Sequence, residues 1–262
     1  MIRRVNKILQ ARSQRRLAFG TFIQLNSPET CEIAASSGMD FVIIDMEHGA
    51  FGIEAAVNLI RAAESGGATP VVRIDQYSRA SVLKVLDAGA VGVIVPNVES
   101  AQQLQDVVSA TRYAPAGTRG ACPCVRVADH GLIDWAQHVR WCEQNVMVIA
   151  LVETEQGVTN FEEIIGVEGL AAVAIGQFDL SVSMGLAGAH DHPDVLSKQA
   201  DMLSHAKRRG VGVLGVVFET DPEQAEQGVN RWRQLGADMV AVSGDRFALT
   251  SAFGALKRQF GY

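Results

Sequence analysis

Charged and polar side chains follow several short apolar segments of this sequence, at the point where each segment ends. The segment Phe41–Ile44 leads directly into Asp45, Glu47 and His48. Later segments are followed by Arg73 and Asp75, by Asn97, by Glu153, Thr154 and Glu155, by Gln177 and Asp179, by Glu219, and by Ser243 and Asp245. Carboxylates that gather in one place repel one another unless a cation lies between them. If these ends converge, the residues could hold Mg²⁺ or Mn²⁺, which prefer oxygen ligands and keep positions open for water and substrate.

Each of these residues also has a structural interpretation. Asp45 could cap the turn after its segment, and His48 could be a hydrogen-bonded structural residue. Arg73 could be a surface ion-pair partner of little energetic value. The Cys122-Pro123-Cys124 motif has no second cysteine pair to complete a metal or redox site. Only the shared position of the polar residues after apolar segments favours a functional site.

The elements that must position these residues alternate regularly along the chain. Eight apolar segments predict strands at Leu17–Leu25, Phe41–Asp45, Pro70–Ile74, Val91–Pro96, Val146–Val152, Ala171–Ile175, Val211–Phe218 and Met239–Ser243. Their continuous hydrophobicity is typical of parallel strands that are buried on both faces. Helices are predicted at Pro28–Ser37, Ile53–Ser65, Arg79–Ala88, Ser100–Thr111, Gly157–Ile165, His192–Arg209, Asp221–Leu235 and Asp245–Gln259.

Eight strand–helix alternations predict an α/β fold, a single (β/α)8 TIM barrel that spans residues 1–262 as one domain. Active sites of such barrels lie at the C-terminal ends of the strands, where the polar residues above are found. An open, doubly wound sheet is the alternative, but no G-x-G-x-x-G motif follows the first strand. The long irregular stretch 113–134 is a candidate functional loop.

Helix boundaries are predicted from capping residues. Ser27, Ser78, Glu99 and Asp221 are expected to begin helices, and Gly210 and Gly236 to end them. The first 28 residues contain six basic residues and no acidic one: Arg3, Arg4, Lys7, Arg12, Arg15 and Arg16. A transit peptide has this composition. The alternative is a short helix that closes the bottom of the barrel, since Val5, Ile8 and Leu9 share one helical face.

Composition limits the class of protein. The formal net charge of −6 disfavours binding to nucleic acid or to a membrane surface, because phosphate groups attract basic patches. No apolar run reaches the ~20 residues that span a bilayer. The four scattered cysteines are typical of a reduced, cytoplasmic protein.

Six motifs are distributed over nearly the whole chain: 41–49 (FVIIDMEHG), 70–73 (PVVR), 86–90 (LDAGA), 112–120 (RYAPAGTRG), 152–154 (VET) and 175–181 (IGQFDLS). Together these motifs resemble the HpcH/HpaI aldolase family of metal-dependent pyruvate aldolases, whose best-known member cleaves 4-hydroxy-2-oxoheptanedioate. The sequence departs from the family pattern at Leu151, Gln177 and Ala121–Cys124, on the side expected to select the aldehyde.

The resemblance implies a role for each site residue. Glu153 and Asp179 would bind a divalent metal (Mg²⁺, Mn²⁺ or Co²⁺), and Glu47 would hold metal-bound water. Arg73 would bind the 2-oxo acid and stabilise its enolate. His48, oriented by Asp45, would transfer a proton. The backbone N–H groups of Gly176, Gln177, Phe178 and Asp179 would contact the pyruvate carboxylate. No Schiff-base lysine is expected, because no lysine follows a predicted strand.

The resemblance implies cleavage of a 4-hydroxy-2-oxo acid to pyruvate and an aldehyde, in the catabolism of aromatic compounds. It also implies a homo-oligomer, a trimer or a hexamer, in which subunits exchange the C-terminal helix. Two reactions on the same site are alternatives. One is condensation of oxaloacetate with an acetyl thioester, as in siderophore biosynthesis, and the other is oxaloacetate decarboxylation. A non-catalytic barrel that only binds an oxo acid is disfavoured, since binding alone does not require His48.

Overall fold

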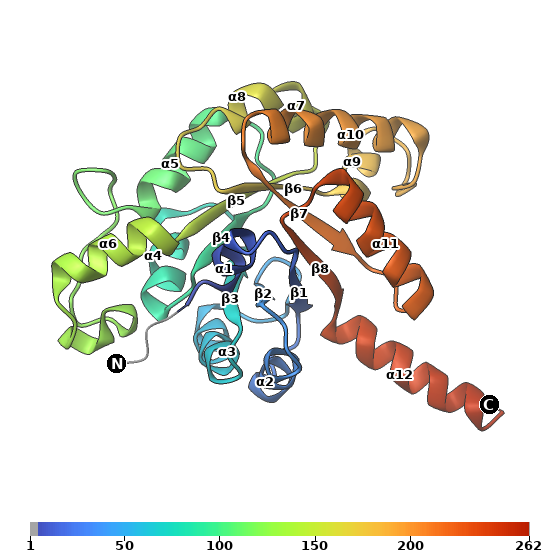
Figure 1. Ribbon diagram of the computed structural model, residues 1–262, viewed down its shortest axis with the longest axis horizontal. Helices are drawn as coiled ribbons and strands as arrows, with labels where there is room; N and C mark the ends of the chain where they lie inside the picture. Colours follow the sequence, from blue (N-terminus) through green and yellow to red (C-terminus); the bar gives the residue numbers. More distant parts are fainter. Residues whose placement is uncertain (1–4, 262) are drawn as a thin grey trace.

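The computed structural model describes residues 5–261, which form a closed barrel of eight parallel strands surrounded by helices (Figure 1). Each strand pairs with its neighbours in sequence, and β8 closes the barrel against β1. The predicted (β/α)8 barrel is therefore confirmed. Its strands are β1 (Ala18–Ile23), β2 (Phe41–Asp45), β3 (Thr69–Arg73), β4 (Gly92–Val95), β5 (Met147–Val152), β6 (Ala172–Ile175), β7 (Gly212–Val217) and β8 (Met239–Gly244).

Alternation along the strands divides the core into an outer and an inner layer. In β2, Val42 and Ile44 pack in the large cluster beneath the helices, whereas Phe41 and Ile43 belong to the cluster inside the barrel. Successive strand side chains point to opposite faces, so Asp45 continues the inner series. This alternation directs the side chains at the strand ends towards the mouth of the barrel.

The same counting applies to the other strands that matter for function. Val71 lies in the inner cluster, and Arg73 follows it by two residues. Leu151 of β5 lies there too, and Glu153 is next in that series. The registers of β2 and β3 place Asp45 directly opposite Arg73. Parity and register thus bring these three charged residues to one end of the barrel.

The helices that alternate with the strands match the predicted ones closely. They are α2 (Pro28–Ser36), α3 (Ile53–Ser65), α4 (Arg79–Ala88), α5 (Ala101–Thr111), α10 (Pro193–Arg208), α11 (Pro222–Leu235) and α12 (Asp245–Gln259). The single helix predicted at 157–165 is instead two short helices, α7 (Glu155–Thr159) and α8 (Phe161–Ile165), with Asn160 between them. None of the helices within residues 5–261 is long and apolar enough to cross a membrane.

Three helical elements were not predicted from the sequence. The 3₁₀ helix η1 (Arg126–Gly131) lies within the predicted irregular loop, and α6 (Trp135–Asn145) follows it. The third, α9 (Gln177–Ser183), begins directly after β6 and contains residues expected in the site. The sequence of α9 carries little helical signal, since this helix is only seven residues long and has no side-chain cap. Helix α6, in contrast, has a capping residue, Asp134, that the sequence analysis did not use.

Side-chain caps mark most of the predicted helix starts. Ser27, Ser78 and Asp221 each accept a hydrogen bond from a backbone N–H of the first turn. The cap predicted at Glu99 is wrong, because Ser100 has the short hydroxyl that reaches the N–H of the third residue of its helix, Gln103. Gly236 ends α11 in the left-handed conformation as predicted. The cap of α10 is Arg209, and Gly210 follows it with a positive φ.

The two terminal helices have opposite environments (Figure 1). Helix α1 (Lys7–Ser13) buries Ile8 and Ala11 against the inner cluster, which confirms the helix expected to close the bottom of the barrel. Arg3 and Arg4 of the basic stretch lie outside the described residues. Helix α12 extends away from the barrel body (Figure 1) and exposes Phe253, Leu256 and Phe260.

Candidate functional site

An ion pair between Arg73 and Asp45 forms the centre of the candidate site. The Nε and Nη2 atoms of Arg73 donate to the two carboxylate oxygens of Asp45 at 2.8 and 2.7 Å. Asp45 is fully buried, and Gln24 Nε2 donates to its Oδ2 at 2.7 Å. Burial raises the pKa of the Asp45 carboxyl, but the hydrogen bonds and the charge of Arg73 outweigh burial and lower it. Asp45 therefore remains ionised and fixes the guanidinium plane.

The contacts of Asp45 correct one expectation. Asp45 was predicted to orient the ring of His48, yet its Oδ1 reaches the backbone N–H groups of Glu47 and His48, at 3.1 and 3.3 Å. Within residues 5–261, no hydrogen bond joins the Asp45 carboxylate to the His48 ring. The physical reason is the register of β2 and β3, which places Arg73 opposite Asp45 and fills its acceptor sites. His48 is exposed at the mouth of the barrel.

Glu47 faces the same guanidinium from the other side. Its Oε2 lies 3.1 Å from Arg73 Nη1, is buried, and accepts no hydrogen bond from the described residues. Burial and the charges of Asp45 and Asp179 raise the pKa of the Glu47 carboxyl, although Arg73 and His48 oppose this. A buried carboxylate oxygen without a hydrogen bond indicates a position that a bound cation, water or substrate would complete.

Glu153 is the most perturbed acid of the site. It is almost completely buried after β5, and its Oε1 accepts the backbone N–H of Asn97 at 2.8 Å. Burial, together with the charges of Glu47 and Asp179, raises the pKa of Glu153 to about 7, against the Asn97 hydrogen bond and the charge of Arg73. Acids that raise one another's pKa in this way are stabilised as carboxylates by a cation between them.

Gly176 brings the start of α9 close to Glu153. A Cβ atom at Gly176 would lie 2.6 Å from Glu153 Oε2, so only glycine fits at this approach. The approach places Asp179, in the first turn of α9, close enough for its charge to act on Glu153. The side chain of Gln177 turns away, because its Nε2 donates to Gln199 Oε1 at 3.2 Å. The first backbone N–H groups of this turn have no acceptor within the helix, as expected at the start of a helix.

The donor set fits a hard divalent cation. Residues 5–261 contain no cluster of three or more His, Cys, Asp or Glu side chains arranged to hold a metal. Glu153 and Asp179 are the acids that could supply two carboxylate ligands, with water and substrate oxygens as the remainder. Mg²⁺ is often held in this way.

Sequence reasoning missed two residues of the site. Gln24 binds Asp45 and directly follows β1, but the predicted first strand runs to Leu25 and therefore includes it. Phe22 lies with its ring centre 5.6 Å from the guanidinium carbon of Arg73. The sequence indicates only that Phe22 points inwards from β1. Because the search considered polar residues, it did not include Phe22.

Other conspicuous residues have structural roles. Asp245 is buried and accepts the backbone N–H groups of Gln24, Leu25 and Arg246, which joins the loop after β1 to the start of α12. Arg119, from the 112–120 motif, has a fully buried side chain and pairs with Asp87 at 2.9 Å. The four cysteines are free thiols, and Cys122 and Cys124 are exposed.

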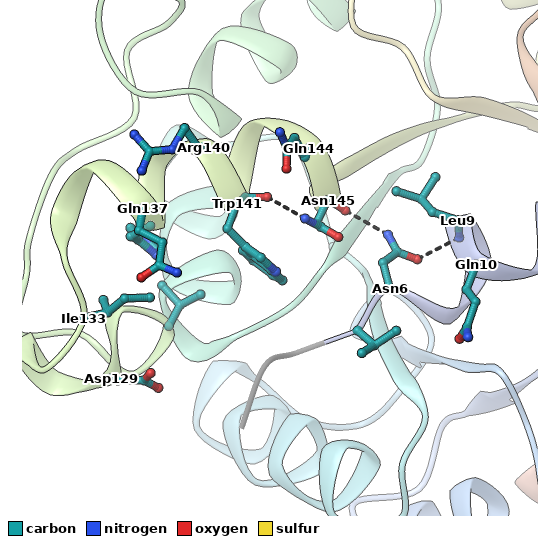
Figure 2. A pocket seen from close by; sticks show the side chains of 13 residues that line it. Asn6, Leu9, Gln10, Asp129, Ile133, Gln137, Arg140, Trp141, Gln144 and Asn145 are labelled. Carbon is teal, nitrogen blue, oxygen red and sulfur yellow. Dashed lines mark hydrogen bonds between the residues drawn. The ribbon is translucent and has the colours of Figure 1, made fainter. Parts of the chain in front are cut away.

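A recess at the other end of the barrel is separate from this site (Figure 2). It lies between α1 and α6, has a volume of about 570 Å³, and is lined by Leu9, Gln137 and Trp141 among others. Asn6 Nδ2 donates across it to the carbonyl of Asn145 at 2.8 Å, just before β5 begins. The recess thus adjoins the N-terminal ends of the strands, away from Arg73 and Glu153.

Comparisons with known proteins agree with the geometry. A model of the HpcH/HpaI aldolase/citrate lyase family matches residues 18–245. The chain is 32% identical, over 80% of its own length and 82% of the relative, to a 2-dehydro-3,6-dideoxy-6-sulfogluconate aldolase from Pseudomonas putida.

Solved structures show the same fold. The crystal structure of an HpcH/HpaI aldolase from Desulfitobacterium hafniense superposes with a TM-score of 0.88 at 30% identity, covering 96% of this chain and 95% of the other. The structure of protein CitE from Mycobacterium tuberculosis in complex with magnesium and pyruvate is more distant, at 22% identity and a TM-score of 0.58, covering 87% of this chain and 85% of that one. At that distance the likeness concerns the fold alone.

Proposed function

The chain belongs to the HpcH/HpaI aldolase/citrate lyase family and is a carbon–carbon lyase; from this premise we propose that it is a metal-dependent aldolase. It cleaves a 4-hydroxy-2-oxo acid into pyruvate, or a related 2-oxo acid, and an aldehyde. One observation carries the proposal: at the end of the barrel where the buried acid Glu153 lies, Asp45 fixes the Arg73 guanidinium, and the charges of Arg73 and Asp179 both act on Glu153. This is a site for a cation and an anionic oxo acid together.

We assign the metal to Glu153 and Asp179, with Mg²⁺, Mn²⁺ or Co²⁺ as the candidates. When bound, the ion supplies Lewis-acid stabilisation of the negative charge that develops on the 2-oxo acid. Glu47 borders this position, and its buried Oε2 lies 3.1 Å from Arg73 Nη1 without a hydrogen bond from the described residues. We infer that Glu47 orients a water molecule there.

Arg73 holds and stabilises the oxo acid. Its guanidinium is immobilised by two hydrogen bonds to Asp45, so it needs no reorganisation when charge develops on the substrate. The backbone N–H groups of Gly176, Gln177, Phe178 and Asp179 are the proposed contacts of the carboxylate. The first N–H groups of a helix have no partner within the helix and carry partial positive charge.

His48 is the proposed proton carrier, because imidazole can gain and lose a proton near neutral pH. In cleavage, the 4-hydroxyl proton passes to His48 while the C3–C4 bond breaks and the C4 oxygen becomes the aldehyde carbonyl. The electron pair of the broken bond stays on the pyruvate half as an enolate, and a proton added at C3 completes pyruvate. Arg246 Nη1 donates to the His48 carbonyl at 3.2 Å and holds this residue at the mouth.

Exchange of the pyruvate methyl protons in D₂O, followed by NMR, tests the proposal without knowledge of the aldehyde. We expect exchange with Mn²⁺ or Mg²⁺, none with a chelator, and a loss of about a hundredfold or more in Glu153→Gln. Glu155→Gln is the matched control, because Glu155 is exposed two residues away. Absence of exchange with every metal would refute the pyruvate aldolase.

Condensation of oxaloacetate with an acetyl thioester is the second candidate, since the matching family includes citrate lyases. It would use the same metal ligands and Arg73. Release of free thiol from acetyl-CoA in the presence of oxaloacetate would distinguish this reaction, and release of CO₂ without a thioester would identify a decarboxylase. Three further points stay predictions: a role in aromatic catabolism, a place in the cytoplasm, and an assembly of three or six subunits that exchange α12.

A further inference from the structure

Three phenylalanine rings form a continuous strip from Arg73 to the outer edge of the barrel mouth. Phe22, in β1, lies beside the Arg73 guanidinium. Its ring stacks on that of Phe218, with 6.1 Å between centres and 27° between planes. The ring of Phe218 lies 5.6 Å from that of Phe247, in the first turn of α12. We call these three residues the aromatic strip.

The strip belongs to the inner face of the barrel. Leu214 lies inside the barrel and Val216 packs against the inner cluster, so Phe218 continues that series beyond the end of β7. Phe22 is only 8% exposed, whereas Phe218 and Phe247 are 52% and 44% exposed. Contiguous exposed aromatic surface next to a polar site is a common feature of ligand-binding surfaces.

The strip and the proposed metal ligands lie on different arcs of the barrel. Phe218, Phe247 and Phe22 follow or occupy β7, β8 and β1, whereas Glu153 and Asp179 follow β5 and β6. Arg73 lies beside Phe22 on one side and pairs with Glu47 on the other, at 3.1 Å between Nη1 and Oε2. A substrate whose oxo acid lies at Arg73 would therefore extend its other end over the aromatic rings.

Charged groups beside the strip are already engaged. Arg246 donates to the carbonyls of His48 and Gln24, both at 3.2 Å, and Asp245 accepts three backbone N–H groups. Hydroxyl or carboxylate groups would gain little here, while an apolar group would cover exposed rings.

This inference rests on the proposed aldolase activity and concerns its partner. We propose that the aromatic strip binds the aldehyde, and that this aldehyde bears an apolar, preferably aromatic, group. The enolate carbon of pyruvate attacks the aldehyde carbon, and the carbonyl oxygen takes up a proton to become the 4-hydroxyl. The apolar group stacks on Phe218, and Phe247 closes its outer edge.

Aldol addition of pyruvate with Mn²⁺ to two aldehydes tests the strip: phenylacetaldehyde as the aromatic probe and glyceraldehyde as the polar one. We expect kcat/KM to favour phenylacetaldehyde by about tenfold or more in the unmodified protein. Phe218→Ala should lower kcat/KM for phenylacetaldehyde about tenfold relative to kcat/KM for glyceraldehyde in the same variant, so that the preference between the two aldehydes is lost. Phe218→Trp should retain the preference. Leu132→Ala removes an apolar side chain that is 83% exposed elsewhere and should have no effect.

The possible outcomes distinguish a failure of the proposed aldehyde site from a failure of the proposed aldolase activity. Normal pyruvate exchange with equal use of both aldehydes, or a Phe218→Ala variant that keeps the preference, would overturn the role of the strip and leave the aldolase standing. Loss of exchange in the unmodified protein would instead remove the proposed function on which the strip depends.

Discussion

Asp45 and Arg73 form a two-point ion pair because their strands place them directly opposite one another at the barrel mouth. Arg73→Lys keeps the positive charge but cannot make both hydrogen bonds. We expect kcat for aldol cleavage to fall about a hundredfold, with the far-ultraviolet circular dichroism unchanged. Arg79→Lys, at an exposed arginine outside the site, is the control and should keep full activity. A fully active Arg73→Lys variant would contradict the need for a fixed guanidinium.

Gly176 is the second sensitive position. In Gly176→Ala the added Cβ would lie 2.6 Å from Glu153 Oε2, so α9 must move away and take Asp179 with it. We expect the affinity for Mn²⁺, measured by isothermal titration calorimetry, to fall about tenfold or more. Gly52→Ala serves as control, because open space surrounds that position and its φ is negative. Unchanged Mn²⁺ binding in Gly176→Ala would argue against a metal between Glu153 and Asp179.

Asp245 should contribute mainly to stability. Asp245→Ala would leave the backbone N–H groups of Gln24, Leu25 and Arg246 without their acceptor. We expect the free energy of unfolding, measured in urea, to fall by about 2 kcal/mol. Asp75→Ala, at an exposed aspartate after β3, should change it little. Equal effects of the two substitutions would show that the link between β1 and α12 is energetically unimportant.

Asp40 should make stability depend on pH. Burial raises the pKa of the Asp40 carboxyl, but hydrogen bonds from Arg16 and the Phe19 N–H outweigh burial and lower it. Because the folded pKa is below the unfolded value, this stabilisation is present above pH ~4 and is lost as the pH falls through the folded pKa. Asp40→Asn should thus destabilise by about 1 kcal/mol at pH 7. Below pH ~3, denaturation curves should give the same free energy of unfolding for Asp40→Asn and the parent protein. A difference in that free energy that does not change with pH would be inconsistent with the ion pair.

The exposed face of α12 leads to an expectation about assembly. Phe253, Leu256 and Phe260 leave a large apolar surface in contact with water. We expect the protein to form an oligomer through this helix and Phe253→Glu to reduce its mass in light scattering after size exclusion. Gln259→Glu adds the same charge at an exposed polar position of the helix and should leave the mass unchanged. A monomeric parent protein would rule out the helix exchange.

Much of the fold could be predicted because its signals are local. Each strand is a continuous apolar segment, and the alternation within β2 or β5 already directs Asp45 and Glu153 inwards. The partner of Asp45 could not be predicted in the same way. That partner depends on the register between β2 and β3, which the linear sequence does not show. The sequence therefore favours His48, which is close along the chain, over Arg73 as the partner of Asp45.

The aromatic strip was missed for a related reason. In the sequence, Phe218 is the last residue of an apolar segment that predicts a strand. Nothing in the sequence relates it to Phe22 or Phe247, which are distant along the chain. Their contact arises from closure of the barrel between β8 and β1, where the register shifts between Gly20 and Phe22. Such an irregularity is a property of the closed sheet as a whole.

The separation of the strip from the acidic residues has an evolutionary consequence. Phe22, Phe218 and Phe247 occupy the β7–β8–β1 side, and Glu153 and Asp179 the β5–β6 side, with Arg73 between them. With the proposed roles, substitutions on the first side would change which aldehyde is accepted, while the residues proposed to form the enolate stay the same. A gene with this layout can diversify by small steps, each inherited from a working ancestor.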